Sequence, residues 1–345
     1  MQRTLADVHI GSLQLESGVR LHRVSLRYEL IGPSHAPVIL VCHALTGSHI
    51  SVGVAENPGW WSGLIGEGKY IDTKRYRILT FNVLAGCNGS TGPSSIDPET
   101  NKPYRTTFPK ITIRDMVHAQ AKALQKLHID HLAAVIGGSL GGMQAMEWGL
   151  LYPEMMDRLI ILAATPVLSD YGIAFNHIAA AAIKNDHNWN GGHYRDSTLL
   201  RGLEIARMVG MVTYRSQDLF MERFRRKKQA DTFSVNAYLE YQGEALARCF
   251  DANSYLYLLE AMNHHDIGEG RGGWKKACKD FKAPVLIVSF GKDLIYTPSL
   301  IQRFSEATPQ SSYYHVPSVF GHDGFLTEFA KWGPIIARFL ANRKI

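Results

Sequence analysis

The sequence predicts an α/β fold in which a mostly parallel β-sheet is covered by helices, with an all-helical segment inserted between two strands. Up to about residue 165, short apolar runs of strand length alternate with helical patterns, and this alternation resumes after residue 282. Between these parts strand-like runs nearly vanish, while Met, His, Asn, Tyr and Arg recur at helical spacing. Strands that alternate with helices form parallel sheets covered on both faces.

The individual elements follow from their apolar patterns. Alternation in residues 19–30 predicts an antiparallel hairpin at the sheet edge. Apolar runs predict short buried strands at 38–42 and 76–81, and further strands at 132–136, 158–162, 284–289 and 313–316. Thr112 and Asp115 have capping-box spacing and open a helix through Leu127. A second helix ends near Tyr152, and a final one spans about 325–341. We expect a core domain of residues 1–165 and 283–345, and a helical lid domain of residues 166–282.

Composition excludes several classes of protein. No apolar run approaches the roughly 20 residues that cross a membrane, and the N-terminal residues lack the apolar core of a signal peptide. The four cysteines are scattered without a C-x-x-C pair, which argues against a zinc site and favours a reducing compartment. We therefore expect a cytoplasmic protein without a metal ion or a membrane partner.

The net charge of +6 includes a basic cluster at residues 223–228. Only Phe224 is interleaved with these cations, and the segment fits no nucleic-acid-binding module, so we expect no nucleic-acid partner. Two interpretations stay open: a solvated basic helix face, or a contact with the phosphates of an anionic cofactor.

The segment Gly137–Gly141 reads G-G-S-L-G and lies between a predicted strand and a predicted helix. Strand, G-x-S-x-G and helix form the nucleophile elbow of α/β-hydrolase-type enzymes, in which the serine sits on a strained turn. The pattern therefore predicts an α/β-hydrolase fold with Ser139 as the nucleophile.

A serine hydroxyl needs a base, and the base needs an orienting carboxylate. In this fold the chain order is serine, then acid, then histidine. Asp293 follows the strand predicted at 284–289, and His322 lies between the last strand and the last helix. These positions predict a catalytic triad of Ser139, Asp293 and His322.

An oxyanion hole requires two backbone N–H groups. Leu140 supplies one, because it follows the nucleophile at a helix N-terminus, and Leu45 in the loop after the strand at 38–42 is our choice for the other. We interpret His43 in that loop as a shaping residue rather than a rival base. Cys87 has no basic neighbour in sequence to lower its thiol pKa, so we interpret it as structural.

Several further segments carry a resemblance that covers about residues 15–340. They are His43–Gly47, Asn82–Leu84, Gly86–Ser95, Ile111–Val117, Gly137–Gln144, Ala206–Met208, Phe250–Tyr255 and Gly321–Asp323. In these motifs the chain resembles the homoserine O-acetyltransferase family. The resemblance implies a core with a helical lid, a homodimer formed through the lid, and no permanently bound cofactor. It also implies acetyl transfer from acetyl-CoA to the γ-hydroxyl of L-homoserine, a step of methionine biosynthesis.

The resemblance further implies three substrate-binding residues. Arg207 matches the arginine that binds the substrate carboxylate, and Tyr214 matches its hydrogen-bonding companion. Asp323 matches the carboxylate that receives the substrate ammonium. Alternatives remain in the donor, which could be succinyl-CoA; in the acceptor, which could be another hydroxy amino acid; and in the reaction, which could be that of a plain serine esterase.

Overall fold

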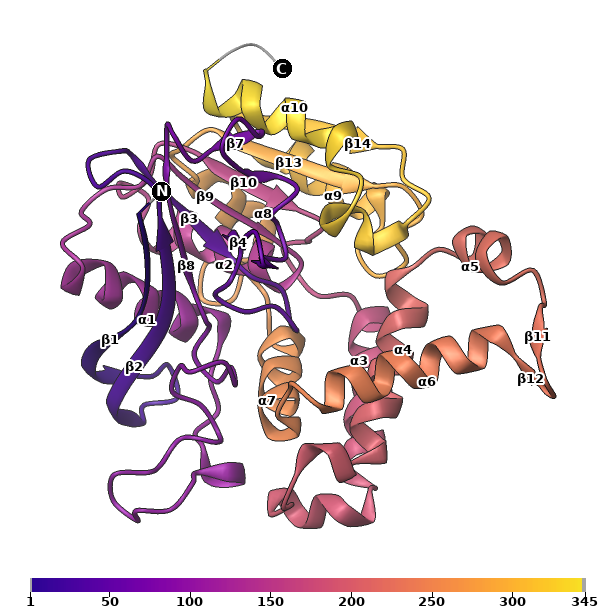
Figure 1. The fold of residues 1–345 in the computed structure, drawn as a ribbon. Helices are drawn as coiled ribbons and strands as arrows, with labels where there is room; N and C mark the ends of the chain where they lie inside the picture. Colours follow the sequence, from indigo (N-terminus) through magenta and orange to yellow (C-terminus); the bar gives the residue numbers. More distant parts are fainter. Residues whose placement is uncertain (1, 343–345) are drawn as a thin grey trace.

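The central feature of the fold is an eight-stranded sheet with the strand order β1-β2-β8-β3-β9-β10-β13-β14 (Figure 1). The computed structural model describes residues 2–342. The pairs β1–β2 and β2–β8 are antiparallel, and all pairs from β8 to β14 are parallel. The strands are β1 (Arg3–Gln14), β2 (Arg20–Ile31), β3 (Val38–Cys42), β8 (Arg77–Phe81), β9 (Ala134–Gly138), β10 (Leu159–Leu162), β13 (Val285–Phe290) and β14 (Ser311–Val316).

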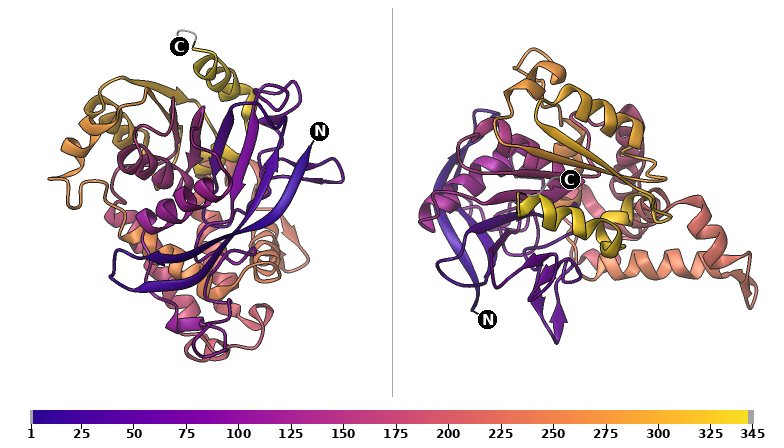
Figure 2. Two further views of the ribbon diagram at one scale, coloured as in Figure 1. Left: turned by 90° about the vertical axis from the view of Figure 1, so that its left-hand side faces the viewer. Right: turned by 90° about the horizontal axis from the view of Figure 1, so that it is seen from above.

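Helices cover both faces of this sheet (Figure 2). On one face α1 (Ile113–Lys126), α2 (Leu140–Leu151) and α9 (Pro298–Ala307) pack with alternate strand residues such as Leu40. On the other face α10 (Phe329–Leu340) packs with the intervening residues such as Ile39. The same face is covered by residues 52–71, whose short ribbons are β4 (Gly53–Val54), β5 (Asn57–Pro58), β6 (Ile65–Gly66) and β7 (Ile71–Asp72). The alternation follows from the two-residue period of a strand, so each buried strand contributes to both cores.

Residues 166–282 are mainly helical. Their helices are α3 (Asp170–Lys184), α4 (Arg201–Tyr214), α5 (Gln217–Phe224), α6 (Ser234–Ala247), α7 (Ala252–Asn263) and α8 (Trp274–Ala277). A small hairpin of β11 (Lys228–Gln229) and β12 (Thr232–Phe233) joins α5 to α6. Together α5, this hairpin and the start of α6 form an arm that projects from the body (Figures 1 and 2). Within residues 2–342, no helix combines the length and apolar character needed to cross a membrane.

Short 3-10 segments complete the connections. They are η1 (Arg105–Thr107), η2 (His187–Gly192), η3 (Ser197–Leu199), η4 (Cys278–Asp280) and η5 (Gly321–Leu326). The predicted capping box of α1 is present, since Thr112 accepts from the Asp115 N–H and Asp115 accepts from the Thr112 N–H. Each of the six strands predicted from residue 38 onward begins and ends within two residues of its predicted bounds.

Two element predictions were wrong. Residues 19–30 do not form a hairpin by themselves; residues 20–30 belong to the single strand β2, whose pairing with β1 runs from the pair Arg3 and Ile31 to the pair Gln14 and Arg20. Gly11 and two register shifts interrupt the alternation of β1, which explains why the sequence pattern missed it. The last helix begins at Phe329 rather than near Phe325, because residues 321–326 form η5.

Candidate active site

Ser139 lies on the sharp turn between β9 and α2, with φ 56° and ψ −126°. This left-handed backbone is strained for a residue with a side chain. A Cβ atom at Gly137 would lie 2.1 Å from the Gly141 carbonyl oxygen, and one at Gly141 would lie 2.1 Å from the Cys42 oxygen. The turn therefore requires both glycines of the motif, and it raises the Ser139 hydroxyl above the carboxyl edge of the sheet.

Asp293 and His322 come from loops after β13 and β14 and meet in a buried pair. His322 Nδ1 lies 2.7 Å from Asp293 Oδ2. The other carboxylate oxygen accepts the N–H groups of Ile295 and Tyr296, each at 2.9 Å. Because Nδ1–H donates to the carboxylate, Nε2 of the neutral ring is left as the proton acceptor. This is the orientation that a general base requires.

Aromatic side chains hold the imidazole ring of His322. Tyr296 stacks on it at 5.0 Å between ring centroids, and Tyr214 and Phe325 lie at 5.7 and 5.3 Å. Burial raises the pKa of Tyr296, an effect opposed by the neighbouring Ser139 hydroxyl. The Tyr296 hydroxyl makes no hydrogen bond within residues 2–342. Sequence reasoning missed Tyr296, whose backbone contacts Asp293 while its ring contacts His322.

One cavity of about 240 Å³ brings most of the predicted site residues together. Its walls include Leu45, Ser139, Arg207, Tyr214, His322 and Asp323. Asp293 lies behind His322, and Leu140 is the first residue of α2. Among the hydrogen bonds of the described residues, none joins Ser139 to His322. The three residues of the predicted triad therefore converge on one site, without a hydrogen bond between Ser139 and His322 among the described residues.

The two backbone N–H groups expected to bind an oxyanion belong to buried residues, Leu45 and Leu140. Neither group donates to an acceptor in the part of the chain that the structure describes. The Leu140 N–H also lies at the N-terminus of α2, where the helix dipole favours negative charge. Both donors are thus available to a ligand.

His43 is a shaping residue. Its Nδ1–H donates to the Ala44 carbonyl at 2.8 Å, and its Nε2 accepts the Val83 N–H at 3.0 Å. Carbonyl and N–H groups of a trans peptide point in opposite directions. By fixing the Ala44 carbonyl, His43 therefore also fixes the direction of the Leu45 N–H. Burial lowers the pKa of His43 to about 4, so the ring is neutral near pH 7.

This depressed pKa predicts a loss of stability in acid. In the unfolded chain His43 takes up a proton near pH 6.5, whereas in the folded chain it does so only near pH 4. Between these values the unfolded state binds more protons, so stability is fully present above pH 6.5 and falls towards pH 4. The expected loss from His43 is on the order of 2 kcal/mol by pH 5. Urea unfolding measured at pH 7 and pH 5 checks this.

The control compares two glutamine variants. His43→Gln should reduce the difference in unfolding free energy between pH 7 and pH 5, while His35→Gln, at an exposed position, should leave it at the wild-type value. An unchanged pH dependence in His43→Gln would contradict the assignment.

The predicted substrate-binding residues differ in their surroundings. Arg207 on α4 lines the cavity and takes part in no ion pair within residues 2–342. Burial raises the pKa of Tyr214, at the end of the same helix. Asp323, predicted to receive an ammonium group, already binds Arg215, whose Nε lies 3.0 Å from Asp323 Oδ2. No motif in the sequence indicated Arg215.

Comparison with known proteins agrees with this geometry. A family model described as the alpha/beta hydrolase fold matches residues 37–329, which establishes the class of the chain. The homoserine O-acetyltransferase of Carboxydothermus hydrogenoformans is 41% identical over 96% of this chain and 94% of its own length. The chain belongs to the homoserine O-acetyltransferase family.

Solved structures share the fold of this chain. The crystal structure of homoserine O-acetyltransferase from Bacillus anthracis has a TM-score of 0.93 and 27% identity, and covers 100% of this chain and 99% of that one. Esterase E22 has a TM-score of 0.91 and 28% identity, over 98% of this chain and all of that one. The same fold thus occurs in a named transferase and a named esterase.

Proposed function

We propose that this chain transfers the acetyl group of acetyl-CoA to the γ-hydroxyl of L-homoserine through an acyl-enzyme on Ser139. The observation that carries the proposal is the cavity, which combines a nucleophile and base with side chains of both charges. An esterase needs only the nucleophile and the base. Arg207 and Asp323 would add recognition of an amino acid, whose carboxylate and ammonium require opposite charges.

In the first half-reaction the Ser139 oxygen attacks the thioester carbonyl carbon while His322 Nε2 takes the hydroxyl proton. The N–H groups of Leu45 and Leu140 stabilise the oxyanion of the tetrahedral intermediate. When the intermediate collapses, the carbon–sulfur bond breaks, and His322 returns its proton to the departing thiolate. The products are free coenzyme A and acetyl-Ser139.

In the second half-reaction homoserine binds with its carboxylate on Arg207 and its ammonium on Asp323, with Tyr214 beside Arg207. His322 takes the proton of the γ-hydroxyl, whose oxygen attacks the acyl carbon. The ester bond to Ser139 then breaks, and the proton passes to the serine oxygen. Water competes at this step, but a well-oriented hydroxyl can have an effective molarity of about 10⁵ M or more. Substrate anchors therefore favour transfer over hydrolysis.

Thiol release measured in the steady state tests the proposal. With acetyl-CoA the rate should rise strongly when homoserine is added, and O-acetylhomoserine should form in equal amount. The same assay with succinyl-CoA and with serine identifies the donor and the acceptor. A rate that is independent of homoserine would favour the esterase function suggested by the likeness to esterase E22. A preference for succinyl-CoA would instead make the enzyme a succinyltransferase.

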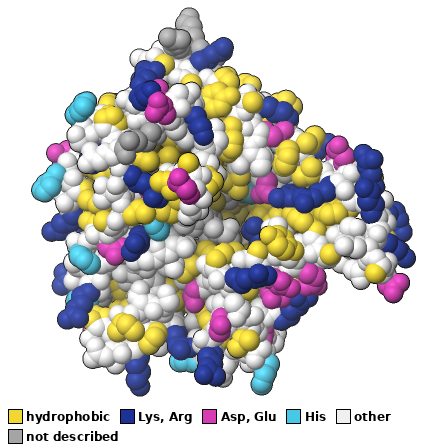
Figure 3. Space-filling model, in the orientation of Figure 1, with side chains coloured by type: hydrophobic (Ala, Val, Ile, Leu, Met, Phe, Trp, Pro, Cys, Tyr) yellow, Lys and Arg dark blue, Asp and Glu magenta, His cyan; other side chains and the backbone are white. Residues whose placement is uncertain are grey.

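We also propose a homodimer that forms through the helical segment 166–282, which we interpret as a lid domain on the core. Large apolar side chains are exposed there: Tyr171, Ile178, Leu199, Ile205, Val212, Met221 and Tyr241. Lys and Arg side chains gather on the projecting arm (Figure 3). Exposed apolar surface of this kind is typical of a protein interface. Sedimentation velocity would measure the oligomeric state.

The same proposal needs no resident cofactor or metal ion, because the thioester supplies the activated acyl group. No membrane or nucleic-acid partner takes part in it. We propose a cytoplasmic location, consistent with four unpaired cysteines within the described residues, and a role in methionine biosynthesis.

A further inference from the structure

The ion pair between Arg215 and Asp323 lies beside the catalytic residues, and the steps above use Asp323 but not Arg215. Both side chains line the cavity that contains Ser139. They are largely buried, with exposed fractions of 21% for Arg215 and 13% for Asp323. Asp323 follows His322 directly, and Arg215 follows the last residue of α4. The pair therefore joins the loop of the catalytic base to the helical segment.

The surroundings of Arg215 fix the direction of its guanidinium group. The backbone leaves α4 in an extended conformation at Arg215. The guanidinium carbon lies 5.5 Å from the ring centroid of Tyr238 on α6. A planar guanidinium on an aromatic face is a favourable and directional contact. The next residue, Ser216, donates its hydroxyl to the Val319 carbonyl, which attaches this turn to the loop before His322.

The contact is specific to one oxygen of the carboxylate. Arg215 Nε binds Asp323 Oδ2, while Oδ1 has no hydrogen-bond partner within residues 2–342. Arg207, which also lines the cavity, has no carboxylate partner in that part of the chain. The ion pair therefore occupies Oδ2 and leaves Oδ1 open to a ligand.

We propose that Arg215 is a positioning residue for the acceptor site: it holds Asp323 so that Oδ1 receives the ammonium group of the amino acid. The inference rests on the proposed function. It goes further by assigning ammonium recognition to a pair of residues rather than to Asp323 alone. Arg215 itself does not touch the substrate.

Three acceptors separate this role from a general structural one. Homoserine carries both charged groups, γ-hydroxybutyrate lacks the ammonium, and propanolamine lacks the carboxylate. With acetyl-CoA as donor, Arg215→Gln should lower kcat/KM for homoserine and for propanolamine about tenfold or more. It should leave kcat/KM for γ-hydroxybutyrate within about twofold of wild type. Arg207→Gln should show the complementary pattern, with propanolamine unaffected.

Control variants make the test specific. The guanidinium carbon of Arg223 lies 4.5 Å from the ring centroid of the same Tyr238, and Arg223 does not contact Asp323. Arg223→Gln should therefore leave kcat/KM unchanged for all three acceptors. Arg215→Lys keeps the charge without the planar group, so its kcat/KM for homoserine and propanolamine should lie between the values for wild type and Arg215→Gln. In the Asp323→Asn background, Arg215→Gln should cause no further loss, since it acts through that carboxylate.

If Arg215→Gln lowered kcat/KM equally for all three acceptors, the inference would be overturned, because such a result would indicate a structural role. Losses confined to homoserine and γ-hydroxybutyrate would also overturn it, since Arg215 would then bind the carboxylate. The first burst of thiol release without acceptor reports folding and acylation and should be unchanged. If wild type released thiol at the same rate with homoserine as without it, the proposed function would fail, and this inference with it. If wild type responded to homoserine but Arg215→Gln did not show the expected pattern, this inference would fail while the proposed function would stay supported.

Discussion

Replacement of Ser139 by alanine is expected to lower kcat for acetyl transfer by at least about 10⁴-fold. Alanine keeps the Cβ atom, so the strained backbone of the elbow is unchanged, and the pair of His322 and Asp293 stays in place. Only the oxygen that accepts the acyl group is lost. Steady-state thiol release measures kcat, and rapid mixing with acetyl-CoA measures the burst that reports acyl-enzyme formation. Both the turnover and the burst should disappear.

A second buried serine provides the control. Ser305 on α9 is also buried and hydrogen-bonds to Ser311, away from the cavity, so Ser305→Ala should keep the kcat and the burst of wild type. Intact-mass measurement after mixing with acetyl-CoA should find one added acetyl group on wild type and none on Ser139→Ala. Normal turnover in Ser139→Ala would mean that the acyl group passes directly from donor to acceptor, and would rule out the covalent mechanism.

The parallel core could be predicted because its information is local. Each central strand is a short, continuous apolar run, as expected for strands buried on both faces. The elbow combines a strand, two glycines and a helix within a few residues. Strand β1 was missed because a glycine and two register shifts break its alternation. It forms a strand because it pairs with β2, and the sequence of β1 alone does not show that pairing.

The convergence of Ser139, Asp293 and His322 could be predicted from chain order, because the ends of parallel strands meet at one edge of the sheet. Arg215 and Tyr296 could not. Arg215 meets Asp323 across 108 positions of sequence, and nothing near it in the chain marks that partner. Tyr296 lies three residues after Asp293, but its stacking on His322 depends on how two separate loops pack. Such contacts between distant segments become visible only in three dimensions.

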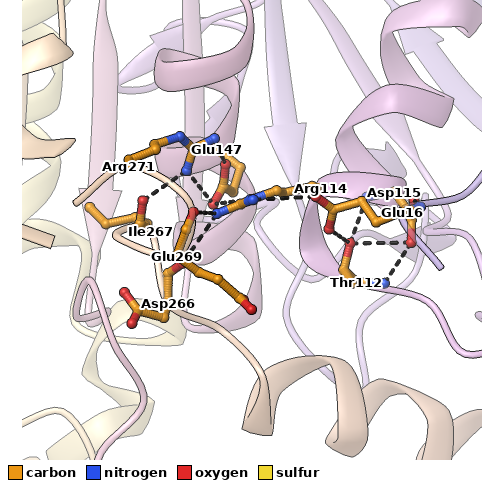
Figure 4. Close-up of polar contacts among 9 residues, drawn as sticks. All are labelled: Glu16, Thr112, Arg114, Asp115, Glu147, Asp266, Ile267, Glu269 and Arg271. Carbon is orange, nitrogen blue, oxygen red and sulfur yellow. Dashed lines mark hydrogen bonds and ion pairs between the residues drawn. The ribbon is translucent and has the colours of Figure 1, made fainter. Parts of the chain in front are cut away.

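The second large effect is expected at Glu147, which lies on the helix that follows the nucleophile. Its carboxylate accepts from Arg271 at 2.7 and 3.1 Å and from Arg114 at 3.2 Å (Figure 4). Arg114 also donates to the Glu269 carbonyl, at 2.7 Å. The network thus joins α1 and α2 to the last part of the helical segment 166–282. The carboxylate is almost fully buried, so neither arginine can exchange it for water without rearrangement.

Glu147→Ala should therefore lower the free energy of unfolding by about 3–5 kcal/mol, because it removes the buried counter-ion that two guanidinium groups share. Among the described residues Arg114 then keeps only Glu16, at 3.3 Å, and Arg271 keeps no carboxylate partner. Urea unfolding at pH 7 measures the change. Glu154→Ala removes the carboxylate of an exposed ion pair with Lys282 and should change stability by less than about 1 kcal/mol. If Glu147→Ala lost no more stability than Glu154→Ala, the network would be a set of surface-like contacts rather than the connection that holds the helical segment on the core.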